Sequence, residues 1–185
     1  MRAVYGDEEN ARAARFRAMA LPYVDDVYSL ARYLLGNTAD AEDAAQEAFL
    51  RAFRHFDTFH GVAIKPWLFA ILRNVCWSIR KSSARFAASL DGDDDRAAPL
   101  WSAEGETPEA EVLRQRDSTE VRRLLDELPL AFREVLVLRE IDDLSYREIA
   151  EIVGVPVGTI MSRLARGRAM LRAAWLAGEC GEKAP

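Results

Sequence analysis

The sequence contains few of the residues on which disulfide frameworks, metal sites and enzyme centres depend. Its two cysteines, Cys76 and Cys180, are too few and too far apart for a disulfide framework or a zinc site. The two histidines, His55 and His60, stand near a loop, where surface or turn positions are the simpler interpretation. A phosphate-binding glycine loop and a nucleophile motif are also missing from the sequence. We therefore expect no cofactor, no metal and no intrinsic catalytic activity, and an enzyme is the weakest functional hypothesis.

Long apolar runs are absent too. No run approaches the roughly 20 residues of a membrane span, and the N-terminus lacks the charged-then-apolar layout of a secretory signal. Half of the 185 residues are hydrophobic, which is enough for helical cores in one ordinary domain or two small ones. We expect a cytoplasmic protein with no membrane insertion.

Acidic residues outnumber basic ones overall, but two segments carry basic residues and no acid. The net charge is −5, which alone argues against a nucleic-acid binder. Residues 65–85 nevertheless carry no acid and hold Lys65, Arg73, Arg80, Lys81 and Arg85. Residues 157–172 likewise carry no acid and hold Arg163, Arg166, Arg168 and Arg172. Two basic patches on an acidic background are compatible with nucleic-acid binding.

The stretch 144–172 predicts two helices joined by a tight turn. Ser145 can cap the first helix, and Glu148, three residues later, completes a capping box. Gly154 breaks that helix, and Pro156 suits the first turn of a second one.

The second helix of this stretch has two distinct faces. At about 100° per residue, one face gathers Thr159, Ser162, Arg163 and Arg166. Another face gathers Ile160, Leu164 and Leu171. A helix that packs on one side and offers hydroxyls and guanidiniums on the other is typical of a helix-turn-helix that reads a major groove. The alternative is an ordinary helical hairpin with a solvated basic face.

The N-terminal part of the chain predicts two further helical segments. Residues 11–35 have apolar positions at helical spacing, after a polar and frayed start, and Pro22 kinks or restarts the segment. Gly36-Asn37 ends it, and either Thr38 or Asp40 caps the next helix.

That next helix, residues 41–56, has a broad apolar face and an acidic opposite face. The apolar face comprises Ala41, Ala45, Ala48, Phe49, Ala52, Phe53 and Phe56. Asp43 and Glu47 are like charges one turn apart, which costs a few tenths of a kcal/mol unless a basic group such as Arg51 answers them. A solvated face and a basic partner surface both remain open.

A loop at 57–66, which contains Lys65, precedes a helix over 67–86. Its predicted buried side comprises Leu68, Ile71, Leu72, Val75, Cys76 and Ile79. Its other side comprises Arg73, Trp77, Arg80 and Lys81. Stacked bases and phosphates would use both a tryptophan and cations, whereas the alternative is that Trp77 packs on a neighbouring helix.

The segment 87–116 predicts a flexible linker between two domains, 11–86 and 117–178. Its first 26 residues, 87–112, carry eight acids against Arg96 alone. Its alternating aspartates lack the glycine and glutamate of a calcium loop. The second domain opens with Asp117 or Ser118 as a cap, and its first helix has the apolar stripe Val121, Leu124, Leu125 and Leu128. We predict an all-α fold of two small helical domains, the second made of four short helices.

Three segments in this order and spacing resemble the extracytoplasmic-function sigma factors, compact two-domain initiation factors of bacterial transcription in the sigma-70 family. The segments are DAEDAAQEAFLRAF, KPWLFAILRNVCWSIRK and LPLAFREVLVLREIDDLSYREIAEIVGVPVGTIMSRLARGR. The resemblance runs from about Leu21 to Trp175 apart from the linker. Met161 departs from it, because many relatives carry a Lys or Arg there, as does Ser78, where relatives commonly have Asp.

The resemblance implies a role for each domain. The first would dock on the coiled coil of the largest subunit of core RNA polymerase through Asp43, Gln46 and Glu47. Its loop and following helix would engage the minus-ten promoter element and capture a flipped base, and the residues implied are Lys65, Trp67, Arg73, Asn74, Trp77, Arg80 and Lys81. The second would read the minus-thirty-five element through Ser145, Tyr146, Thr159, Ser162, Arg163 and Arg166.

The resemblance also implies that the acidic linker threads the polymerase cleft and that an anti-sigma protein holds the factor inactive. A rival hypothesis is a free-standing repressor or activator with the same helix-turn-helix. Such a regulator would need a dimer interface or a sensor domain, whereas here the other half is a basic, tryptophan-bearing helical domain. The helix over 67–86, which a simple repressor does not need, therefore favours the sigma factor.

Overall fold

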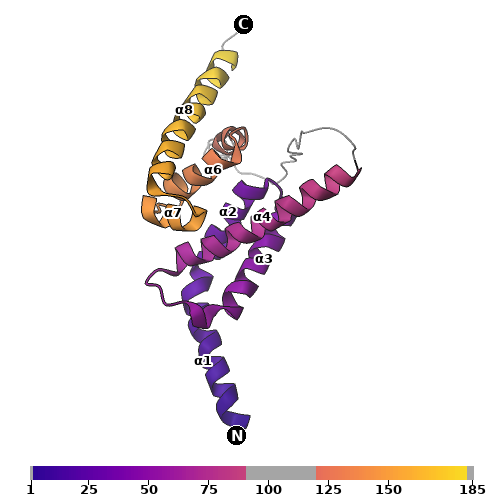
Figure 1. The fold of residues 1–185 in the computed structure, drawn as a ribbon, viewed down its shortest axis with the longest axis vertical. Coiled ribbons are helices and arrows are strands. Elements are labelled where there is room, and N and C mark those ends of the chain that lie inside the picture. Colours follow the sequence, from indigo (N-terminus) through magenta and orange to yellow (C-terminus); the bar gives the residue numbers. More distant parts are fainter. Residues whose placement is uncertain (1, 91–119, 183–185) are drawn as a thin grey trace, which may run out of the picture. The chain divides into compact units, whose positions relative to one another are not determined.

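The computed structural model describes residues 2–90 and 120–182, and the side chains of residues 9–84 and 120–177 (Figure 1). Every regular element within those ranges is helical, which confirms the all-α prediction. The chain divides into two compact units, Met1–Ala97 and Ala98–Pro185, each described here by itself. Most of the predicted linker, with its rejected calcium loop, and the predicted caps Asp117 and Ser118 lie outside the described residues. None of the described helices is long and apolar enough to cross a membrane.

The first unit begins with a helix that is interrupted at Pro22. α1 spans Arg2–Ala20, the 3-10 turn η1 spans Leu21–Tyr23, and α2 spans Val24–Leu35. The predicted restart at Pro22 is confirmed, because the proline occupies the first turn of η1. The predicted frayed start is wrong, since α1 already begins at Arg2. The second half of α1 packs against α3 through Phe16. Adding residues at the N-terminal end of a helix that has already formed requires no further nucleation step.

A left-handed glycine and an asparagine cap separate α2 from α3, which spans Thr38–Arg54. Gly36 has φ +84°, a conformation that glycine adopts without steric cost. The cap of α3 is Asn37, whose side-chain oxygen accepts a 2.8 Å hydrogen bond from the Asp40 backbone N–H. The prediction of Thr38 or Asp40 as the cap is therefore wrong: the extended backbone of Asn37 places its own side chain at the helix end.

The helix that carries the predicted minus-ten face starts earlier than the sequence indicates. After the 3-10 turn η2, Phe56–Thr58, a short loop at 59–63 leads into α4, Ile64–Leu90. Lys65 and Pro66 thus lie in the first turn of α4 and not in a loop, which corrects the predicted loop at 57–66. A proline fits there because the first-turn N–H groups have no partner within the helix.

The core of the first unit forms where α2, α3 and α4 pack on one another, with α1 also contacting α4. α3 contributes a buried row of small side chains, Ala41, Ala44, Ala48 and Ala52. Small side chains let the axes of α2 and α4 approach α3 closely. α4 fills the space with Leu68, Phe69, Leu72, Val75 and Cys76, all buried. The prediction that Cys76 is a core residue is confirmed.

The second unit has a helix over 120–126, followed by α6, Leu130–Leu136, and a π-helical turn η3, Val137–Ile141. α7 spans Tyr146–Val153 and α8 spans Val157–Glu182. The prediction of four short helices is wrong for α8, which has 26 residues. No proline interrupts it, and its internal Gly167 is buried against α6.

α8 packs closely on α6 at Gly167. A Cβ added there would lie 3.0 Å from Leu136 Cδ1 and 3.4 Å from Phe132 Cβ. The core around this crossing is made of apolar side chains from every element, including Leu124, Val135, Leu138, Leu144, Ile149, Val153, Ile160 and Leu164. A side chain at position 167 would therefore require Leu136 and Phe132 to shift.

Candidate nucleic-acid interface

A reciprocal capping box starts α7. The Ser145 hydroxyl oxygen accepts a 3.3 Å bond from the Glu148 N–H, and the Glu148 carboxylate accepts bonds from the Ser145 N–H at 2.8 Å and hydroxyl at 2.6 Å. These hydrogen bonds lower the pKa of the Glu148 carboxyl, the side-chain bond to Ser145 contributing most and burial opposing it. The predicted capping box is confirmed.

The turn between α7 and α8 is built from Gly154 and Pro156. Gly154 has φ +72° and donates its N–H to the Ala150 carbonyl at 2.8 Å. The Pro156 carbonyl accepts from the N–H groups of Thr159 at 2.9 Å and Ile160 at 3.2 Å, so Pro156 precedes the first residue of α8. The geometry is that of a helix-turn-helix with a tight turn.

α8 has the two faces that its sequence predicts. Ile160 and Leu164 are buried, whereas Ser162 and Arg166 are exposed and Thr159 and Arg163 are partly exposed. The Ser162 hydroxyl donates to the Thr159 carbonyl at 2.9 Å, and its oxygen keeps acceptor capacity. Met161, at 55% exposure, flanks this polar face. The arrangement can offer acceptors and guanidinium donors to base edges.

Two arginines outside the predicted set hold the helix-turn-helix to η3. Arg139 donates to the Leu144 carbonyl at 2.8 Å, and its guanidinium lies 5.3 Å from the Tyr146 ring centroid. Arg168 of α8 pairs with Glu140 at 2.6 Å, and hydrogen bonds to Glu140 and then Tyr146 raise its pKa. Glu140 and Arg168 are 28 residues apart, so no local sequence signal links them.

The polar face of α4 carries an exposed tryptophan. The Trp77 side chain is 43% exposed, with the Arg73 guanidinium 5.4 Å from its ring centroid. Asn74 and Lys81 are exposed on the same helix. The exposed part of the indole is available for stacking.

Three other predicted minus-ten residues make contacts inside the first unit. Lys65 pairs with Asp26 of α2 at 2.9 Å and lies 5.3 Å from the Phe69 ring centroid, with 19% of its side chain exposed. Arg80 donates to the Leu34 carbonyl at the end of α2 at 3.0 Å. The partly buried Trp67 ring lies 5.1 Å from that of Phe59. The family resemblance placed these side chains with the DNA-facing set, but it cannot show which cations reach back to α2.

The acidic face of α3 presents Asp43 and Gln46 to solvent, beside Leu50 at 52% exposure. Glu47 forms an ion pair with Arg51 at 2.6 Å, one turn along α3, which confirms that Arg51 answers part of the like-charge repulsion. The exposed carboxylate, amide and leucine form a contiguous surface that suits a basic partner with an apolar centre.

These features define an all-helical DNA-binding protein with a helix-turn-helix unit and a second basic helix. The model for sigma-70 region 2 matches residues 19–86, and the model for sigma-70 region 4 matches residues 118–171. The chain is 37% identical over 155 residues to the ECF RNA polymerase sigma factor SigW of Bacillus subtilis. The aligned residues cover 81% of this chain and 83% of the relative. It is 36% identical over 159 residues to the ECF RNA polymerase sigma-E factor of Escherichia coli K12, with 83% and 82% covered.

A solved structure agrees with these comparisons. The sigma factor RpoE from Bartonella quintana, determined in complex with the anti-sigma factor NepR, is similar with a TM-score of 0.72 at 27% identity, covering 87% of this chain and 96% of that one. The chain therefore belongs to the sigma-70 family of RNA polymerase sigma factors, in the extracytoplasmic-function group. It is a transcription initiation factor.

Proposed function

We propose that the chain binds core RNA polymerase in the cytoplasm and directs it to promoters by reading two DNA elements with its two units. The observation that carries this proposal is the pairing, in one chain, of a capped helix-turn-helix with a helix whose polar face exposes Trp77 among cations. Bond-making chemistry would belong to the polymerase. Membership of the sigma-70 family supports the same assignment.

The second unit would bind the minus-thirty-five element. Thr159, Ser162, Arg163 and Arg166 would face base edges in the major groove, with α7 crossing the backbone. Ser145 and Tyr146 would lie near phosphates. Because the capping box already uses the Ser145 hydroxyl, its contribution would come from orienting the positive end of α7 toward a phosphate.

The first unit would engage the opened minus-ten element. Trp77 would stack on an unpaired base, an interaction worth about 1–3 kcal/mol per base. Arg73, Asn74 and Lys81 would contact the displaced strand, while the loop at 59–63 would receive a flipped base. Lys65, Trp67 and Arg80 would act mainly by holding α4 and the loop in place.

The acidic face of α3 would dock on the coiled coil of the largest polymerase subunit through Asp43, Gln46 and Glu47. The domains at 11–86 and 117–178 would then engage different parts of the polymerase, with residues 87–116 passing through its cleft. Because the RpoE relative was solved with the anti-sigma factor NepR, we propose that an anti-sigma protein also restrains this chain.

Transcription by purified core polymerase, with and without the full chain, tests the proposal. The templates would be a duplex promoter selected by the reconstituted holoenzyme from randomised DNA, and a scrambled control. We expect a transcript on the selected template only, and its loss when Arg163 and Arg166 are both replaced by alanine. A transcript level that does not change when the protein is added would refute the proposal.

A further inference from the structure

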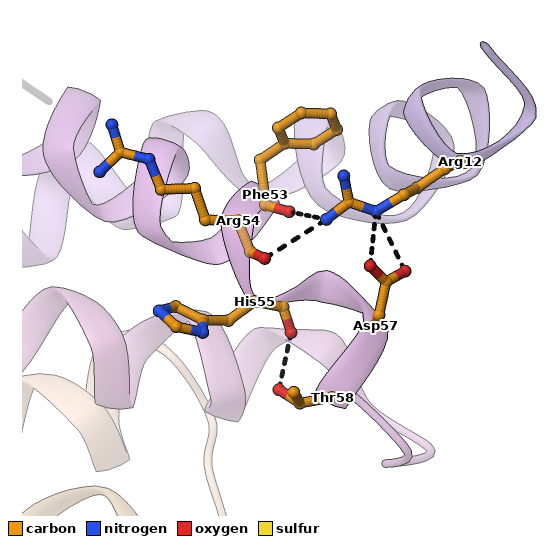
Figure 2. Close-up of polar contacts among 6 residues, drawn as sticks. All are labelled: Arg12, Phe53, Arg54, His55, Asp57 and Thr58. Carbon is orange, nitrogen blue, oxygen red and sulfur yellow. Dashed lines mark hydrogen bonds and ion pairs between the residues drawn. The ribbon is translucent and has the colours of Figure 1, made fainter. Parts of the chain in front are cut away.

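Arg12 of α1 contacts both the end of α3 and the η2 turn that follows it (Figure 2). One amino group of Arg12 donates to the backbone carbonyls of Phe53 at 2.6 Å and Arg54 at 3.3 Å. Its Nε pairs with the Asp57 carboxylate at 2.9 Å, and its guanidinium lies 4.7 Å from the Phe53 ring centroid. Arg12 thus closes the C-terminal end of α3 and holds the η2 turn at the same time.

An aromatic chain continues from α1 toward the loop at 59–63. The buried Phe16 ring contacts that of Phe56 edge-on at 5.2 Å, and Phe56 stacks on Phe59 at 6.4 Å. Phe59 contacts Trp67, in the first turn of α4, at 5.1 Å. The packed rings transmit a displacement because protein interiors are close-packed.

The loop itself lies against this chain of rings. A Cβ at Gly61 would come within 2.9 Å of the Phe59 ring, so the backbone of the loop passes close over that side chain. Val62, the next residue, is fully exposed at the tip. The position of Phe59 therefore determines where the loop backbone can lie.

We propose that α1 belongs to the promoter-opening machinery, with Arg12 as a positioning residue that sets the loop at 59–63 through η2 and the ring chain Phe16–Phe56–Phe59. This rests on the proposed function, in which that loop receives a base of the minus-ten element. Arg12 lies before residue 19, where the match to sigma-70 region 2 begins. The positioning role is therefore supplied by a segment outside the part that defines the family.

Open-complex formation by the reconstituted holoenzyme on two DNA probes tests this assignment. One probe is the selected duplex promoter, and the other is the same DNA with the minus-ten bases mismatched so that they are already unpaired. We expect Arg12→Met to slow opening of the duplex about tenfold, the scale of one charge-assisted hydrogen bond. On the unpaired probe the variant forms the complex at close to the wild-type rate, because the loop no longer has to compete with base pairing.

Companion variants separate positioning from folding. Arg12→Lys keeps the charge near Asp57 but loses the guanidinium fork that reaches the carboxylate with Nε and the two carbonyls with one amino group, so it gives an intermediate rate. Asp57→Asn removes the ion pair and leaves the carbonyl bonds, and it slows the duplex probe alone. Arg17→Met, on the exposed side of the same helix, leaves both rates unchanged.

The outcomes distinguish this inference from the proposed function. Equal losses on both probes, or a loss of core-polymerase affinity with Arg12→Met, would show that Arg12 only stabilises the fold and would overturn the assignment. Unchanged duplex opening with both Arg12→Met and Asp57→Asn would also overturn it. If Trp77→Ala has no effect on either probe, the proposed minus-ten role of α4 fails, independently of α1.

Discussion

α4 and α8, the two helices that we assign to promoter DNA, are held in place by different kinds of residue. In α8 the supporting groups, Leu164, Gly167 and Arg168, lie apart from the polar face that includes Arg163 and Arg166. In α4 the polar face includes a supporting group, because Arg80 bonds to the end of α2, although both Arg80 and neighbouring Lys81 are exposed. A cation on an amphipathic helix is therefore a poor indicator of DNA contact until its reach to other helices is known.

The largest expected effect concerns the buried leucines, where the two helices should behave alike. Leu164→Ala in α8 and Leu72→Ala in α4 should each lower the free energy of unfolding by about 2–5 kcal/mol, because each leaves a cavity. Urea denaturation followed by circular dichroism measures both. If Leu72→Ala lowers the free energy of unfolding far less than Leu164→Ala does, the prediction is contradicted. α4 then depends mainly on its polar contacts, and the difference between α4 and α8 is larger than the structure indicates.

The polar face of α8 should affect DNA binding without affecting stability. Arg166→Ala should weaken holoenzyme binding to the selected promoter by about 1–3 kcal/mol and relax sequence preference at one position. The free energy of unfolding should change by less than about 0.5 kcal/mol, as for other exposed side chains. Uniform weakening on all DNA sequences would assign Arg166 to a phosphate instead of a base.

Substitutions of the two neighbouring cations of α4 should have different effects, one on stability and the other on DNA binding. Arg80→Met should cost about 1 kcal/mol of stability, since the Leu34 carbonyl loses its donor, and leave the salt dependence of DNA binding unchanged. Lys81→Met should do the reverse, reducing the logarithmic salt slope by about 1. Titration of fluorescent promoter DNA at several salt concentrations, beside denaturation, gives both quantities. Identical behaviour of the two variants would remove the distinction drawn between α4 and α8.

The smallest expected effect is a pH dependence of stability at the helix cap of the second unit. The pKa of Glu148 is lowered in the folded chain, so its contribution is present above the unfolded pKa of about 4.3 and is lost as pH falls through the folded pKa. Ser145→Ala should cost about 1 kcal/mol at neutral pH, with the difference from wild type shrinking in acid. Denaturation of both proteins between neutral and acidic pH measures it; a constant difference would contradict the assignment.

Features set by neighbours in the sequence were predictable. The capping box needs only Ser145 and Glu148, the turn needs Gly154, and the buried row of α8 follows from helical periodicity. The exposure of Trp77 could also be predicted, because it falls opposite the apolar stripe of its own helix.

Contacts between distant segments could not be predicted in this way. Lys65 meets Asp26 across 39 positions, the difference of their numbers, and Arg12 meets Asp57 across 45. Nothing in the local sequence of either cation distinguishes it from a solvated one. The cap at Asn37 was not predicted for a different reason. An asparagine that follows a glycine is as typical of a turn as of a helix N-cap, so the sequence does not distinguish the two.

Gly167 has a practical consequence for redesign. Because Gly167 packs closely against Leu136 and Phe132 of α6, the segment at 157–166 is followed directly by a residue that is fixed by its contact with α6. A graft of that segment from another family member should change the DNA sequence that is recognised, provided that its buried positions match Ile160 and Leu164. A graft that replaces Gly167 would in addition require Leu136 and Phe132 of α6 to shift.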